Sequence, residues 1–176
     1  MTGRPRRSRM LAMTATLAAV LVLLGTTVVT GSVGAVVPPS TAHGEHFLFK
    51  SALNNAFCIS DAAGNTNGRK VTLAGCSTID TERWTLTEDT DGTNALVDSQ
   101  GMCVDTTGRV AGDGLAVKVF TCGFGAHQRF RYTAAGLIQA TGTTLCLWVP
   151  GAAAGAAVSV ATCNNASTRE MFKLAH

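Results

Sequence analysis

The side chains with the most varied chemistry lie in one stretch of the chain, from Cys103 to Phe130. This stretch contains a cysteine pair, an aspartate two residues after the first cysteine, an aromatic residue two before the second, and a closing His-Gln-Arg-Phe. A carboxylate accepts hydrogen bonds, an amide both donates and accepts them, and an aromatic ring covers apolar surface. The combination is suited to binding a polar ligand that has one apolar face.

Weaker copies of this stretch lie on both sides of it. The first cysteines of the three pairs are 45 and 43 residues apart, the second cysteines 46 and 41, and the closing aromatic residues 46 and 42. These three markers agree on a period of about 44 residues. We therefore divide the chain after its N-terminal segment into repeats at about 47–92, 93–136 and 137–176.

The cysteine spacing predicts one disulfide in each repeat. Six cysteines allow fifteen pairings in principle, but the two cysteines of each pair are only 18, 19 or 17 residues apart, so local bridges are the simplest connectivity. Each is expected to stabilise the fold by about 3 kcal/mol. A metal site is poorly supported, because no C-x-x-C pair occurs and the four histidines are scattered, and we expect neither metal nor cofactor. The predicted disulfides are Cys58–Cys76, Cys103–Cys122 and Cys146–Cys163.

Short alternations of apolar and polar residues, bounded by turn-forming residues, predict an all-β fold with strands in three groups of four. No window after the N-terminal segment sustains a helical period. A four-strand unit of this size cannot bury its own apolar face, so three units are expected to pack around a shared axis, with Trp84, Phe130 and Phe172 in the core. The strands are expected at 47–50, 57–60, 70–74, 84–87, 95–98, 102–105, 116–121, 130–133, 137–140, 145–149, 157–161 and 171–174.

The N-terminal segment has the layout of an export signal. A basic start precedes an uncharged run from Met10 to Val29. Small residues allow cleavage after residue 35, which we prefer, or as late as residue 42, and residues 36–46 would then be a flexible start of a secreted protein. An uncleaved membrane anchor is the alternative, since residues 10–37 are long enough to span a bilayer. The basic residues are Arg4, Arg6, Arg7 and Arg9.

Removal of this segment changes the charge balance. The whole chain carries 14 Lys and Arg against 11 Asp and Glu, but four of the arginines lie in the segment and every acid lies after residue 42. The remainder has 10 basic and 11 acidic side chains, a net charge of −1. We therefore expect no electrostatic attraction to nucleic acid, and no membrane association once the signal is removed.

The repeated arrangement resembles the ricin B-type lectin domains. Each repeat has C-x-D or its remnant, then glycine, then alternating apolar residues up to the second cysteine, then a close similar to Gln-x-Trp. The resemblance covers about residues 47–176 and implies a single domain with the β-trefoil fold that binds carbohydrate. The three closes are Glu82-Arg83-Trp84, Gln128-Arg129-Phe130 and Glu170-Met171-Phe172.

The resemblance also implies where a sugar binds. In this family a sugar lies in a shallow pocket of one repeat, where polar side chains bond its hydroxyl groups and a ring covers its apolar face. The alternative is that the aspartate caps a turn near Thr107-Gly108, the ring fills a gap, and the other polar groups bond the backbone. The family positions fall on Asp105, Phe120, His127 and Gln128, with Lys118 at a more variable polar position.

The flanking repeats depart from the family pattern. In the first repeat, Ser60 occupies the aspartate position and Ala74 the ring position. In the third, these positions hold Trp148 and Ala161. Both repeats are therefore expected to be structural.

Two other classes of function were compared with sugar binding. Glycoside hydrolysis needs two carboxylates facing each other across a cleft, and the acids here lie in turns without a paired arrangement. No Ser-His-Asp signature or nucleophile elbow occurs, so we do not expect an enzyme. A β-trefoil that binds protein, for example an inhibitor or structural module with degenerate sugar sites, stays the alternative. The sequence predicts neither the sugar nor the oligomeric state.

Overall fold

A computed structural model describes residues 46–61, 66–77, 79–88, 91–107 and 113–176. The predicted export segment, residues 1–35 or 1–42, lies outside the described residues, as does the segment that follows it up to residue 45. No helix in the described ranges is long and apolar enough to cross a membrane. The strands are β1 (Leu48–Ser51), β2 (Phe57–Ser60), β3 (Arg69–Lys70), β4 (Thr72–Gly75), β5 (Trp84–Glu88), β6 (Asn94–Asp98), β7 (Met102–Asp105), β8 (Lys118–Thr121), β9 (Phe130–Tyr132), β10 (Ile138–Ala140), β11 (Leu145–Trp148), β12 (Ser159–Thr162) and β13 (Phe172–Ala175).

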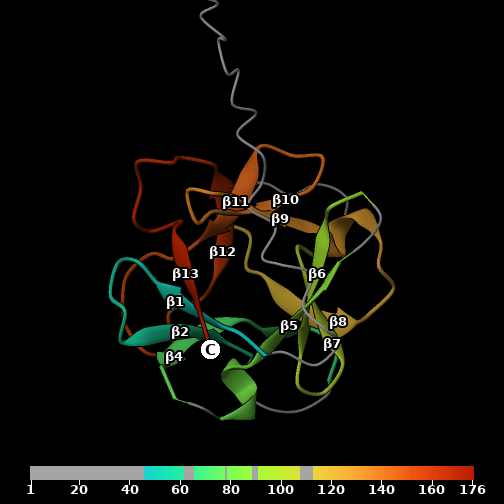
Figure 1. Ribbon diagram of the computed structural model, residues 1–176, viewed down its shortest axis with the longest axis horizontal. Coiled ribbons are helices and arrows are strands. Elements are labelled where there is room, and N and C mark those ends of the chain that lie inside the picture. Colours follow the sequence, from blue (N-terminus) through green and yellow to red (C-terminus); the bar gives the residue numbers. More distant parts are fainter. Residues whose placement is uncertain (1–45, 62–65, 78, 89–90, 108–112) are drawn as a thin grey trace, which may run out of the picture. The chain divides into compact units, whose positions relative to one another are not determined.

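Twelve of the thirteen strands form three groups of four, which confirms the predicted all-β fold of three repeats. The short strand β3 lies outside these groups and pairs with β8. The first repeat contains β1, β2, β4 and β5, the second β6 to β9, and the third β10 to β13 (Figure 1). Two short 3-10 helices, η1 (Asp80–Glu82) and η2 (Ala126–Gln128), precede the last strands of the first and second repeats. Hydrophobic periodicity does not detect elements of three residues.

The first and last strands of each repeat are joined in a closed ring. Between repeats, β5 pairs with β6, β9 with β10, and β13 with β1, so that the C-terminal strand lies against the first one (Figure 1). The neighbouring strands thus cover one another's edges, as in a barrel. Within the repeats, the ring is completed by the pairs Phe47–Trp84, Asn94–Phe130 and Leu137–Met171.

The two inner strands of each repeat form a hairpin, and three buried valines join the hairpins. Val71 donates its N–H to the carbonyl oxygen of Val117 at 2.9 Å, Val117 to that of Val158 at 2.8 Å, and Val158 to that of Val71 at 2.9 Å. Each valine lies five residues before the second cysteine of its repeat. The sequence period is therefore reproduced as a threefold arrangement in space, which is a β-trefoil.

In each repeat, one glycine connects the hairpin to the next repeat. Each lies eight residues before the second cysteine, and their φ angles of +85°, +85° and +81° are in the region that glycine adopts readily. Each donates its N–H to a residue of the following repeat. The bonds run from Gly68 to Val119 (2.8 Å), from Gly114 to Val160 (2.7 Å) and from Gly155 to Leu73 (2.8 Å).

The inner hairpins explain where the predicted strand limits were wrong. The strand expected at 70–74 is divided, because Val71 bonds across to Val117 and leaves its own hairpin ladder. The strands expected to begin at residues 116 and 157 begin two residues later, at Lys118 and Ser159.

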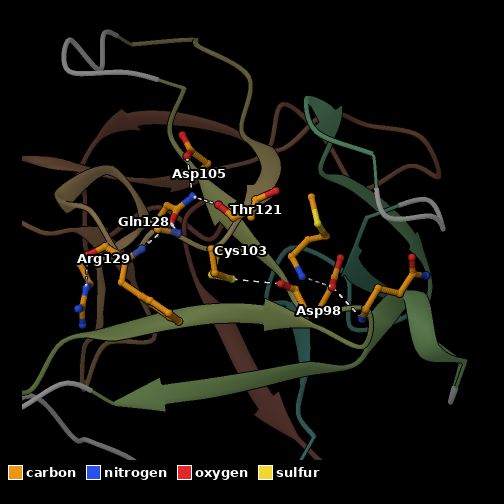
Figure 2. The surroundings of a disulfide bond; sticks show 12 residues. Asp98, Cys103, Asp105, Thr121, Gln128 and Arg129 are labelled. Carbon is orange, nitrogen blue, oxygen red and sulfur yellow. Dashed lines mark hydrogen bonds between the residues drawn. A yellow bond between two sulfur atoms is a disulfide. The ribbon is translucent and has the colours of Figure 1, made fainter.

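The closing aromatic residues lie in the core, as predicted. Trp84 is fully buried and donates its indole N–H to the carbonyl oxygen of Ile59 at 3.0 Å, and Phe130 and Phe172 are 1% exposed. All three predicted disulfides are present, each joining the second strand of its repeat to the end of the third. The bridge of the central repeat lies beside the polar groups considered next (Figure 2).

Candidate functional site

The central hairpin brings three of the predicted site residues to one face. In the register of β7 and β8, Asp105 is opposite Lys118 and Cys103 is opposite Phe120. Opposed and alternate residues of a ladder point to the same side, so Asp105, Lys118 and Phe120 share the outer face. Val104 and Val119, on the other face, are fully buried in the core.

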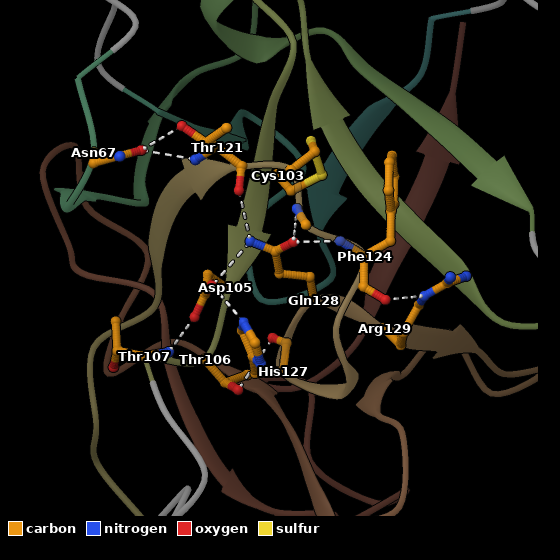
Figure 3. Close-up of polar contacts among 12 residues, drawn as sticks. Asn67, Cys103, Asp105, Thr106, Thr107, Thr121, Phe124, His127, Gln128 and Arg129 are labelled. Atoms are coloured by element: carbon orange, nitrogen blue, oxygen red, sulfur yellow. Dashed lines mark hydrogen bonds and ion pairs between the residues drawn. A yellow bond between two sulfur atoms is a disulfide. The ribbon is translucent and has the colours of Figure 1, made fainter.

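The Asp105 carboxylate is held from two sides. Its Oδ1 accepts a hydrogen bond from the Thr107 N–H at 2.6 Å, and its Oδ2 accepts one from Nε2 of Gln128 at 3.0 Å (Figure 3). Only 5% of the residue is exposed. A carboxylate has about four acceptor positions, so these two donors orient it and leave capacity for hydroxyl groups of a ligand.

Gln128 is buried and uses its whole amide inside the protein. Its Oε1 accepts from the N–H groups of Gly123 and Phe124, at 2.8 and 2.9 Å, while its Nε2 donates to Asp105 and to the carbonyl oxygen of Thr121 at 3.2 Å (Figure 3). The structure therefore gives Gln128 the role of orienting Asp105. Its direct contact with a sugar stays a prediction.

The residues equivalent to Gln128 have the same structural role in the other repeats. Glu82 accepts the N–H of Ser77, and Glu170 accepts that of Asn164 at 2.6 Å. Burial raises the pKa of the Glu170 carboxyl, and the negative charge of Asp113 adds to this effect. All three repeats thus have a side chain that accepts the N–H of the residue just after the second cysteine.

The central repeat differs in the chemistry of this pair. It combines an aspartate with an amide, whereas the flanking repeats combine Ser60 with Glu82 and Trp148 with Glu170. A glutamate in place of Gln128 would put two carboxylates about 3 Å apart, and like charges at that distance disfavour each other strongly. The amide therefore supplies a hydrogen-bond donor to Asp105 that a carboxylate at this position would not supply.

His127 lies beside Asp105 at the edge of the site. Its side chain is 42% exposed, and its Nε2 is 3.4 Å from Oδ2 of Asp105 (Figure 3). The ring packs so closely over Gly125 that a Cβ there would be 2.7 Å from the imidazole Cε1. The absence of a side chain at position 125 thus allows His127 to occupy its position.

Phe120 and Lys118 are half-buried on β8, next to a loop of the first repeat. The Phe120 ring reaches Gly68, where an added Cβ would be 3.8 Å from its Cζ. Asn67 accepts hydrogen bonds from the N–H of Thr121 at 2.7 Å and from its hydroxyl at 3.1 Å. Two repeats therefore build this side of the site.

The Thr107 N–H bond to Asp105 confirms the turn near Thr107 that the alternative interpretation expected the aspartate to cap. Sequence reasoning missed the positive φ angles of Thr107 and Phe124, +55° and +51°, and the N–H that Phe124 donates to Gln128. The sequence signal at Phe124 is weak, since a Gly-Phe-Gly run at residues 123–125 is typical of a turn and indicates nothing more. Among the described residues, no group of three or more His, Cys, Asp or Glu side chains is placed to hold a metal ion.

The equivalent surfaces of the flanking repeats are occupied differently. In the first repeat Ser60 is buried, and the neighbouring Asp61 is 1% exposed with its Oδ2 2.8 Å from Nη2 of Arg69. The same guanidinium lies 3.5 Å from Oδ2 of Asp98 in the second repeat. In the third repeat, Trp148 stands opposite Ser159.

Residues 92–176, which make up the second and third repeats, match the family model of the ricin-type beta-trefoil lectin domain. The match covers slightly less than half of the chain, and the first repeat shares the threefold fold of the matched residues. Comparison with curated protein sequences found no match.

Solved structures share the fold at low sequence identity. The designed threefold-symmetric protein ThreeFoil has a TM-score of 0.69 and 19% identity, covering 74% of this chain and 98% of that one. The C-half of the earthworm R-type lectin, in complex with GalNAc, has a TM-score of 0.60 and 12% identity, covering 74% and 97%. The ricin B-like lectin of Macrolepiota procera, in complex with lactose, has a TM-score of 0.61 and 14% identity, covering 76% and 96%.

Proposed function

We propose that the chain is an exported carbohydrate-binding protein whose central repeat holds a sugar at Asp105. The observation that carries this proposal is the Asp105 carboxylate, which Gln128 and the Thr107 N–H orient on the outer face of the central hairpin. Neither flanking repeat has an aspartate at the equivalent position. The lectin-domain fold points to a binding domain without catalytic chemistry.

The chemistry of the site suits a sugar. Neighbouring hydroxyl groups would donate to the remaining acceptor positions of Asp105, and Phe120 would cover the apolar C–H face. His127 and Lys118, on either side of Asp105, would supply further polar contacts. One shallow site of this kind is expected to bind with about 4 to 6 kcal/mol, in the millimolar to high micromolar range.

Glycan binding by matched variants tests this proposal. The wild-type chain and the variants Asp105→Ala and Asp61→Ala would be applied to immobilised mono- and oligosaccharides that include GalNAc and lactose, the sugars bound to two similar structures. We expect Asp105→Ala to abolish binding and Asp61→Ala to retain it. Equal retention in both variants would contradict a site at Asp105.

Export is tested separately on the expressed chain. Mass spectrometry of the culture medium is expected to find a protein that begins at residue 36 or at residue 43. Recovery of the intact chain in the membrane fraction would instead support the anchor alternative.

A further inference from the structure

Phe124 combines two properties that a soluble domain normally avoids. Its side chain is 45% exposed, and its backbone has a φ of +51°, where L residues other than Asn and Asp are uncommon. The residues on both sides of it are glycines.

The backbone conformation at this position has a structural purpose, whereas the side chain has none that the fold explains. The turn aims the N–H of Phe124 at Oε1 of Gln128, at 2.9 Å, next to the N–H of Gly123. Glycine would donate the same hydrogen bond without the steric cost of a Cβ. An exposed ring adds little to core packing, so the aromatic side chain calls for another explanation.

The Phe124 ring is held in place. The guanidinium carbon of Arg129 lies 5.7 Å from the ring centroid, and Nε of Arg129 donates to the carbonyl oxygen of Phe124 at 3.1 Å (Figure 3). A ring that is already ordered loses little conformational freedom when a ligand contacts it.

Gln128 connects Phe124 to the proposed sugar site. One end of its amide donates to Asp105 at 3.0 Å, and the other accepts from Phe124 at 2.9 Å. Figure 3 shows Asp105 and Phe124 on opposite sides of this amide. A ligand that contacts both residues must therefore extend across the Gln128 amide.

We propose that Phe124 is a second aromatic contact, so that the central repeat binds an oligosaccharide with one sugar residue at Asp105 and an adjacent one on the ring of Phe124. This inference rests on the proposed sugar site. It specifies the class of ligand as a chain of at least two sugar residues.

The test uses the full chain with four substitutions on one array of mono-, di- and oligosaccharides. Phe124→Ala and Phe124→Gly remove the ring, Asp105→Ala removes the first contact, and Ile79→Ala removes an exposed apolar side chain (57% exposed) in the first repeat as a control. Removal of the ring is expected to weaken oligosaccharide binding about tenfold more than it weakens monosaccharide binding. Phe124→Gly should also raise the melting temperature, because glycine relieves the positive φ, so weaker binding by this variant would not reflect misfolding.

The outcomes separate the two proposals. If Asp105→Ala abolishes binding and the Phe124 variants bind all glycans as the wild type does, the second contact is wrong and the site at Asp105 stands. If the Phe124 variants weaken mono- and oligosaccharides equally, the ring supports the first sugar and the extended site is also wrong. Binding that is insensitive to Asp105→Ala, or no binding by the wild type to any glycan, overturns both.

Discussion

The first and central repeats place an aspartate at nearly the same point of one frame, but the two carboxylates have different partners. Asp61, three residues after its cysteine, is buried against Arg69 at 2.8 Å. Asp105, two residues after its cysteine, is held by donors of its own repeat on the outer face of the hairpin. Asp61 lies one residue beyond the end of β2 at Ser60, whereas Asp105 is the last residue of β7, so a shift of one residue separates an internal ion pair from a candidate binding group.

The third repeat differs from the central one in a complementary way. Trp148 takes the place of the aspartate, and the buried partner is Glu170, whose carboxyl has a raised pKa. An acid therefore occupies the glutamine position only where no aspartate faces it. The fold accepts glutamine or glutamate at this position, and the residue at the aspartate position determines which of the two fits.

Truncation of a closing aromatic residue should have the largest effect, and a similar one in each repeat. Phe130→Ala and Phe172→Ala are each expected to lower the free energy of unfolding by about 3 to 5 kcal/mol, because each removes a buried ring. Urea denaturation measures both. A large loss in one variant and none in the other would mean that the repeats do not share one core.

Substitution of the two aspartates should separate an effect on stability from an effect on binding. Asp61→Ala is expected to lower the free energy of unfolding by about 2 to 3 kcal/mol, because Arg69, whose side chain is only 16% exposed, loses a close partner. Asp105→Ala should cost about 1 to 2 kcal/mol, because two hydrogen bonds to a carboxylate that is 5% exposed are lost. Urea denaturation measures both losses. A larger loss for Asp105→Ala than for Asp61→Ala would contradict this assignment.

Gln128→Glu tests whether the amide is needed to hold Asp105. The new carboxylate would lie beside Oδ2 of Asp105 and the carbonyl oxygen of Thr121, where Gln128 now donates, so we expect a loss of about 2 kcal/mol of stability at pH 7. The double variant Asp105→Ser, Gln128→Glu, which copies the pair of the first repeat, should recover part of it. Full stability of Gln128→Glu alone would show that the donor is dispensable.

Glu170→Gln makes the reverse change in the third repeat and should have the smallest effect. Burial raises the pKa of Glu170 above its ordinary value of 4.5, so the folded protein binds the proton more tightly than the unfolded chain. The contribution of Glu170 to the free energy of unfolding is then greatest below pH 4.5 and is lost as the pH rises through the pKa of the folded state. Glutamine keeps the acceptor for the Asn164 N–H and has no charge to desolvate. The free energy of unfolding of the variant should therefore exceed that of the wild type by at most about 1 kcal/mol at pH 7.

The check on Glu170→Gln is a comparison of urea midpoints at pH 4 and pH 7. The advantage of the variant over the wild type should be larger at pH 7. An equal difference at both pH values would mean that ionisation of Glu170 does not affect stability.

The frame was predictable from the sequence because its markers recur with one period. The cysteine pairs and the aromatic residues Trp84, Phe130 and Phe172 keep the same phase in all three repeats, and that phase is set by local spacing. Asp105, Lys118 and Phe120 were named from the family resemblance, and the register of β7 and β8 places them on one face. The division of the strand at Val71 was not predictable, because its cause is a hydrogen bond to another repeat.

The finer roles within the candidate site depend on contacts that local patterns do not encode. The burial of Gln128 follows from N–H groups that a positive φ at Phe124 directs toward it. The ion pair of Asp61 with Arg69 forms across a loop of the first repeat. Both depend on the three-dimensional path of the chain between elements, where a single sequence has no periodicity to indicate it.

The most direct test of a central sugar site is a chemical-shift titration of the ¹⁵N-labelled protein with the glycan that binds most strongly on the array. We expect the largest shifts at the backbone N–H groups of Thr107, Phe124 and Gln128 and at the Gln128 side-chain amide, while the indole N–H of Trp148 stays unchanged. Largest shifts at Trp148, or at Ser60 and Asp61, with none around Asp105, would contradict it.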